Sequence, residues 1–148
     1  MEKNKLWNML AMILGLAAVG LPACMYINSE KGLNSLWIWT LYVNYEGQAT
    51  MLLAKEAIFI PFFIGGVAFI AGLVLFIIAS LPKTKLVFPS MWIPVGIMIG
   101  GMGMFVICGF AIDIEGPLLV MFPVPLGWAT GIASCVFAVI PIVTKRAK

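Results

Sequence analysis

The sequence predicts an all-α membrane protein: a four-helix transmembrane bundle with both termini cytoplasmic and a small extracellular β-like loop between the first and second helices. Two observations predict this fold class. Hydrophobic residues make up 63% of the 148 residues and charged residues only 10%, whereas soluble domains contain about 45–50% and about 25%. Four apolar segments also recur along the chain, whose length suits a single domain of residues 1–148.

Each apolar segment is long enough to cross a membrane. About 20 apolar residues in a helix cross a hydrocarbon core of about 30 Å, and helix is required because lipid offers free backbone groups no hydrogen-bond partner. The predicted spans, none with an acidic or basic residue, are residues 6–28, 57–81, 91–112 and 117–143. Pro123 and Pro125 indicate that the regular part of the fourth helix begins only near Leu126.

The termini and connecting segments differ in charge, and this difference predicts the orientation. The two termini and the connector with Lys83 and Lys85 hold seven basic residues and one acidic residue, a net charge of +6. Residues 29–56 and 113–116 hold two basic and five acidic residues, a net charge of −3. The positive-inside rule places the first group in the cytoplasm and the second on the non-cytoplasmic side of a plasma or cytoplasmic membrane. The positive charge indicates contact with membrane lipid rather than nucleic acid.

A cleaved lipoprotein signal peptide is an alternative interpretation of the first segment. Leu21-Pro22-Ala23-Cys24 resembles a lipobox, and cleavage before Cys24 would leave three spans. We favour the uncleaved span, because proline is awkward before the cleavage site and the apolar run continues to Ile27.

No catalytic or cofactor-binding constellation stands out. The chain has no histidine, which removes bis-imidazole haem, the usual zinc and copper sites and histidine acid–base catalysis. Cys24, Cys108 and Cys135 lie in apolar runs without a CxxC motif, so buried unreactive thiols are expected. Asp113 and Glu115 suit a solvated turn better than acid–base or cation-binding chemistry. We therefore expect no enzyme activity, cofactor or metal.

Small residues at four-residue spacing predict close helix packing, because they let helix backbones approach one another. The pairs are Ala68 and Gly72, Gly96 and Gly100, and Gly127 and Gly131. Two interpretations stay open: packing within one bundle, or a dimerisation face.

The loop of residues 29–56 contains the best candidate interaction surface. Residues 35–45 are rich in alternating β-branched and aromatic side chains, which favours a strand over an interfacial helix. A strand places Leu36 and Ile38 on one face and Trp37 on the other. An edge strand rich in Trp and Tyr is a natural docking element. The candidate interaction residues are Leu36, Trp37, Trp39, Leu41, Tyr42, Val43 and Tyr45.

Three short motifs, together with the predicted topology, give the chain a resemblance to the claudin and peripheral-myelin-protein superfamily. Gly32-Leu33-Asn34-Ser35-Leu36-Trp37 resembles its Gly-Leu-Trp loop signature with three residues inserted. Leu53-Ala54-Lys55-Glu56-Ala57 resembles its Gln-Ala-Ala-Arg-Ala entry into the second span. Leu126-Gly127-Trp128-Ala129 resembles its Tyr-x-Gly-Trp-x motif in the fourth span. The resemblance implies a non-catalytic scaffold that contacts neighbouring membrane proteins or escorts another one.

The chain also departs from that superfamily. The two cysteines that form a disulfide in the superfamily's first outer loop are missing from residues 29–56, and both outer segments are shorter. The C-terminal residues 145–148 do not resemble a PDZ-binding tail. Paracellular sealing is therefore not implied.

Two functional hypotheses follow. The first is lateral assembly, adhesion or scaffolding through the first outer loop, by self-association or with other membrane proteins. The second is an accessory subunit of a larger membrane enzyme complex. A passive channel or transporter is disfavoured, because the spans hold no acidic or basic residue that would bind a coupling ion and few polar residues that would line a wet pore. The polar side chains inside the spans are Asn8, Ser80, Thr130 and Ser134.

Overall fold

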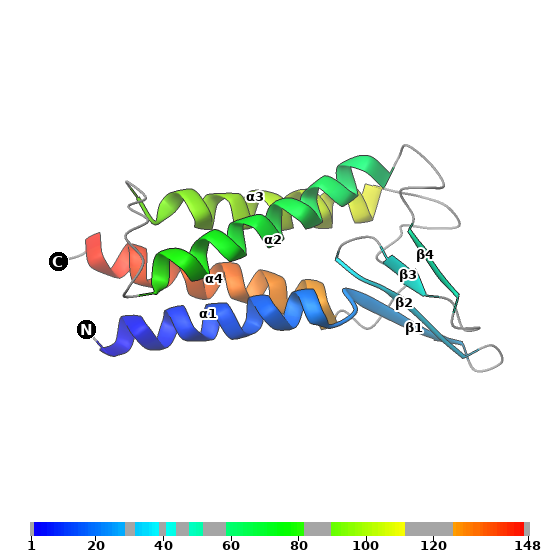
Figure 1. Ribbon diagram of the computed structural model, residues 1–148, viewed down its shortest axis with the longest axis horizontal. Coiled ribbons are helices and arrows are strands. Elements are labelled where there is room, and N and C mark those ends of the chain that lie inside the picture. Colours follow the sequence, from blue (N-terminus) through cyan, green and yellow to red (C-terminus); the bar gives the residue numbers. More distant parts are fainter. Residues whose placement is uncertain are drawn as a thin grey trace.

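A computed structural model describes residues 2–28, 32–38, 41–43, 48–51, 59–81, 90–111 and 126–146. The helices within these residues are α1 (Glu2–Gly20), α2 (Ile60–Ser80), α3 (Trp92–Ala111) and α4 (Leu126–Arg146). The strands are β1 (Cys24–Asn28), β2 (Gly32–Leu36), β3 (Leu41–Val43) and β4 (Ala49–Met51). The helices lie lengthwise beside one another, and the sheet lies at the end opposite to the start of α1 and the end of α4 (Figure 1).

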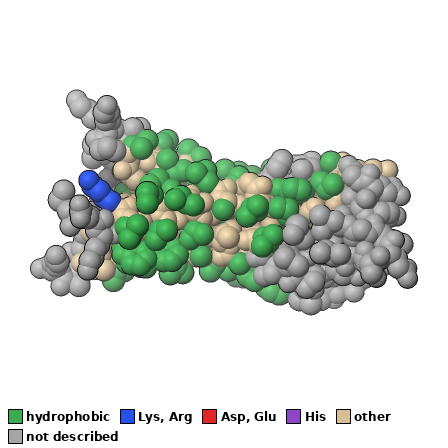
Figure 2. Space-filling model, turned by 90° about the horizontal axis from the view of Figure 1, so that it is seen from below, with side chains coloured by type: hydrophobic (Ala, Val, Ile, Leu, Met, Phe, Trp, Pro, Cys, Tyr) green, Lys and Arg blue, Asp and Glu red, His purple; other side chains and the backbone are tan. Residues whose placement is uncertain are grey.

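Among the described residues, three helical segments are long and apolar enough to cross a membrane: α2, α3 and Leu126–Thr144 of α4. The apolar part of α1, Asn4–Gly20, is shorter. Hydrophobic side chains cover the middle of the molecule in Figure 2, and a basic side chain lies at the end away from the sheet. These features support the membrane-embedded helical protein that the composition predicts.

Prolines determine where two of the helices begin or end. The described part of α4 starts at Leu126, and the amides of Gly127 and Trp128 donate to carbonyls outside the helix, as first-turn amides do, which agrees with the prediction made from Pro123 and Pro125. α1 ends at Gly20, so the predicted first span of residues 6–28 is wrong from residue 21 onward, where the chain leaves the helix and enters β1. Pro22 explains this end, because proline disfavours helical backbone in the residue before it. α2 and α3 begin and end within the predicted spans.

The helices form two close pairs, α2 with α3 and α1 with α4, and the contacts between the pairs are less extensive. In the first pair the rings of Phe62 and Phe105 stack with their centroids 4.1 Å apart. In the second, Trp7 stacks on Phe137 at 5.4 Å, and Ser134 Oγ donates a hydrogen bond of 2.7 Å to the Ala11 carbonyl oxygen. Lipid is as apolar as these side chains, so moving them from lipid into a helix contact yields no hydrophobic free energy. Close packing and hydrogen bonds hold the pairs together instead.

The sheet is an antiparallel meander in the order β1-β2-β3-β4. β1 pairs with β2 from Cys24 opposite Leu36 to Asn28 opposite Gly32. The expectation of one strand over residues 35–45 is wrong: β2 ends at Leu36 and β3 begins at Leu41. The expected aromatic edge strand is also wrong, since β2 and β3 lie inside the sheet while β1 and β4 form the edges of the described strands. Because α1 ends at Gly20, residues 24–28 can form β1, which pairs with β2 along the edge that would otherwise be free.

Four of the six predicted packing positions lie at contacts within the chain. A Cβ added to Gly72 would lie 2.6 Å from the Met98 amide nitrogen of α3. Gly127 lies against the segment after α1, and Gly131 lies against Met102 of α3. Ala68 lies opposite α3, where a Cβ added to Gly101 would be 2.9 Å from its carbonyl carbon.

The remaining pair, Gly96 and Gly100, lies on an exposed face of α3. A Cβ added to either would meet no atom within 4 Å among the described residues. For this pair, the interpretation of packing within one bundle is therefore wrong, and a dimerisation face stays a prediction. The glycines that do bring α2 and α3 together include Gly65 and Gly101, which the four-residue spacing does not select.

Candidate interaction surface

The four-stranded sheet contains the described part of the predicted interaction surface, and backbone contacts attach it to the helices. The first attachment joins the turn after β2 to α2. The Ile38 carbonyl oxygen lies where a Cβ of Gly66 would be, so the two backbones approach each other as only glycine permits. Leu36 and Ile38 are fully buried beside this contact, and Ser35 is 6% exposed.

The second attachment joins the segment between α1 and β1 to the first turn of α4. The Gly127 amide donates to the carbonyl oxygens of Pro22 at 2.8 Å and Ala23 at 3.1 Å, and the Trp128 amide donates to Ala23 at 3.2 Å. These bonds satisfy amides that have no partner inside the first turn of a helix. A Cβ added to Gly127 would lie 2.6 Å from the Ala23 Cα, so the Gly-Trp motif lies at a backbone-to-backbone junction.

The predicted interaction residues fall into three groups: one lies in the core, others lie in or beside the sheet, and two lie outside the described residues. Leu36 belongs to the core and is not a contact surface, because it is fully buried. Trp37 and Val43 are half-buried, which leaves part of each side chain accessible. Leu41 and Tyr42 lie in β3, where Tyr42 is opposite both Leu36 and Thr50. Trp39 and Tyr45 lie outside the described residues.

The alternation that the sequence indicates is confirmed over residues 36–38. Leu36 and Ile38 share the buried side, and the intervening Trp37 is half-buried. Sequence reasoning missed Gly66 and Ile38 as the docking contact. The adjacent pair Gly65 and Gly66 is a signal that it could have used, because neighbouring glycines on a helix point in different directions and permit two close approaches at one level.

The described residues include few side chains with acid–base or metal-binding groups. No group of three His, Cys, Asp or Glu side chains comes together within them. Cys108 and Cys135 are free thiols in α3 and α4. The geometry of this region is that of a small sheet attached to α2 and α4 by backbone contacts.

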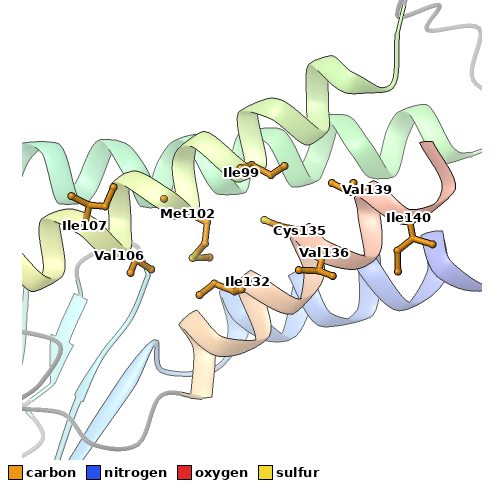
Figure 3. A pocket seen from close by; sticks show the side chains of 10 residues that line it. Ile99, Met102, Val106, Ile107, Ile132, Cys135, Val136, Val139 and Ile140 are labelled. Carbon is orange, nitrogen blue, oxygen red and sulfur yellow. The ribbon is translucent and has the colours of Figure 1, made fainter. Parts of the chain in front are cut away.

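An apolar groove of about 540 Å³ lies between α3 and α4, where the two helix pairs meet (Figure 3). The side chains that line it include Ile99, Met102 and Ile107 of α3 and Ile132, Val136 and Ile140 of α4. Ile107 is 70% exposed at its rim. This chemistry suits hydrocarbon and no polar substrate.

No family model, curated protein or solved structure matches this chain. The resemblance to the claudin and peripheral-myelin-protein superfamily therefore stays a prediction from its three motifs.

Proposed function

We propose that this chain is a non-catalytic integral membrane protein of claudin-like type. It acts in lateral assembly, adhesion or scaffolding, by self-association or by contact with other membrane proteins. The observation that carries this proposal is the double attachment of the sheet. A sheet held by Gly66 and Gly127 on the ends of apolar helices is a firm platform, and the accessible parts of Trp37 and Val43 suit protein contact.

The proposed topology is a four-span bundle with α1 as the first span. α1 has 19 residues, which at 1.5 Å per residue extend about 28 Å, close to the hydrocarbon thickness. It packs along α4, one of the three long apolar helices. The start of α1 and the end of α4 share one end of the molecule, and the sheet lies at the other (Figure 1). With the charge difference between the two ends, this arrangement supports cytoplasmic termini and a non-cytoplasmic sheet.

The first test replaces Trp37 and Trp39 together with serine. We expect loss of higher oligomers and of co-purifying membrane proteins, because aromatic side chains supply most of the contact energy of a small interface. The measurement is native mass spectrometry after extraction in mild detergent, repeated in lipid nanodiscs.

The matched control is Trp7→Ser, which makes the same exchange at the far end, where Trp7 stacks on Phe137. We expect this control to lose stability but still to assemble. That result would show that the double variant fails to assemble because a contact is lost and not because the fold is destabilised. The proposal is wrong if the double variant assembles as the wild type does, or if the wild type is monomeric and without partners in both media.

A further inference from the structure

A second cavity, of about 390 Å³, lies at the end of the helices away from the sheet. All four helices contribute to it, although their residues are far apart in the sequence. Its lining includes Asn8, Ser80, Ser90, Trp92, Pro141 and Ile142. Unlike the groove between α3 and α4, this cavity combines amide and hydroxyl groups with apolar side chains.

The polar side chains inside the helices differ in their partners. Ser134 bonds to α1, and Thr130 Oγ1 donates to carbonyl oxygens of its own helix. Asn8 and Ser80 instead both line the cavity. Ser80 Oγ is buried and has no hydrogen-bond partner in the described part of the chain. Such a group is destabilising unless something supplies a partner, and rotation of the Ser80 side chain about its Cα–Cβ bond would bring the buried hydroxyl to a ligand oxygen in the cavity.

The charge at this end is positive. Lys5 is exposed and lies three residues before Asn8, on the same side of α1. The sequence adds Lys83 and Lys85 between α2 and α3, and further basic residues at 145, 146 and 148. Glu2 is the acidic residue that accompanies them in the sequence. A ligand at this end therefore meets a field that favours negative charge.

We propose that this cavity binds the phosphate-bearing headgroup of an anionic phospholipid. The Ser80 hydroxyl and the Asn8 amide donate hydrogen bonds to phosphate oxygens, and Lys5, one turn before Asn8 on α1, contributes positive charge. Pro141 and Ile142 contact the glycerol and the first acyl carbons, which a soluble phosphate lacks. The site lies at the opposite end from the sheet, so it extends the proposed function without depending on it.

The test measures, by native mass spectrometry, which lipids the full chain retains in mild detergent. The probes are phosphatidylglycerol and phosphatidylcholine with identical acyl chains, and inorganic phosphate as the soluble arm. The wild type is expected to prefer phosphatidylglycerol by about tenfold, equivalent to about 1.4 kcal/mol. The variant with Asn8→Ala and Ser80→Ala is expected to lose this preference. Thr144→Val is the matched control, because Thr144 is exposed and bonds to its own helix.

A second measurement guards against misfolding. Removal of the unpartnered hydroxyl in Ser80→Ala leaves the lipid-free protein as stable as the wild type or more so. Added phosphatidylglycerol then raises the unfolding temperature less than it does for the wild type, because the bound lipid stabilises only the folded state. The proposal is overturned if the double variant keeps the preference, if phosphatidylcholine binds equally well, or if inorganic phosphate displaces the lipid at equal concentration.

Discussion

Gly66→Ala is expected to release the sheet from α2 while the helix pairs stay assembled. The new Cβ would occupy the position of the Ile38 carbonyl oxygen, and a backbone atom cannot rotate away as a side chain can. Displacing that carbonyl pulls Leu36 and Ile38 from fully buried positions. Overpacking typically costs about 1–3 kcal/mol, and we expect this attachment to lose about 3 kcal/mol because rigid atoms meet.

Hydrogen exchange measured by mass spectrometry in detergent tests this local release. Amides of β2 should exchange roughly 100-fold faster in Gly66→Ala, the ratio that corresponds to about 3 kcal/mol. Amides in the middle of α2 and α3 should exchange at the wild-type rate. Gly96→Ala is the control, since a Cβ there meets no described atom within 4 Å. Equal protection of β2 in the two variants would contradict the attachment that we describe.

Hydropathy and proline positions predict most of the helical part of the structure. The ends of α2 and α3 lie within the predicted spans, and the described part of α4 starts at the predicted Leu126. The C-terminal end of α1 could not be placed by hydropathy, because residues 24–28 are nearly as apolar as the helix before them. Pro22 was the available signal, and a proline near a span end is compatible with either a kink or a stop.

The sheet and the cavity depend on contacts that are distant in the sequence. Alternation over residues 35–45 indicates a strand, but it cannot show that β1 comes from the predicted first span and makes β2 an inner strand. In the same way, Asn8 and Ser80 are isolated polar residues in the sequence, and only the arrangement of the four helices brings them to one cavity. Local sequence patterns indicate which residues are buried and whether a segment forms a helix or a strand. They do not indicate which segments lie side by side, because that depends on the whole fold.

Gly101→Ala is expected to separate α2 from α3, whereas Gly100→Ala should leave the fold intact. A Cβ at Gly101 would lie 2.7 Å from the Gly65 carbonyl oxygen and 2.9 Å from the Ala68 carbonyl carbon. Both are helix backbone atoms, so the helices must move apart and lose the contacts of the buried Phe69 and other aromatic side chains. We expect a loss of about 3 kcal/mol. At exposed Gly100, alanine favours the helix by about 1 kcal/mol.

Unfolding in an SDS titration, followed by helical circular dichroism, measures this difference. Gly101→Ala should unfold at clearly lower SDS than the wild type, and Gly100→Ala at the same SDS or higher. Gly100→Ile extends the comparison, because it would block a dimer through the exposed face without touching the α2–α3 contact. Unchanged stability with loss of dimer in that variant supports a dimerisation face at Gly96 and Gly100. Equal destabilisation by the two alanine variants would show that α3 turns a different face towards α2.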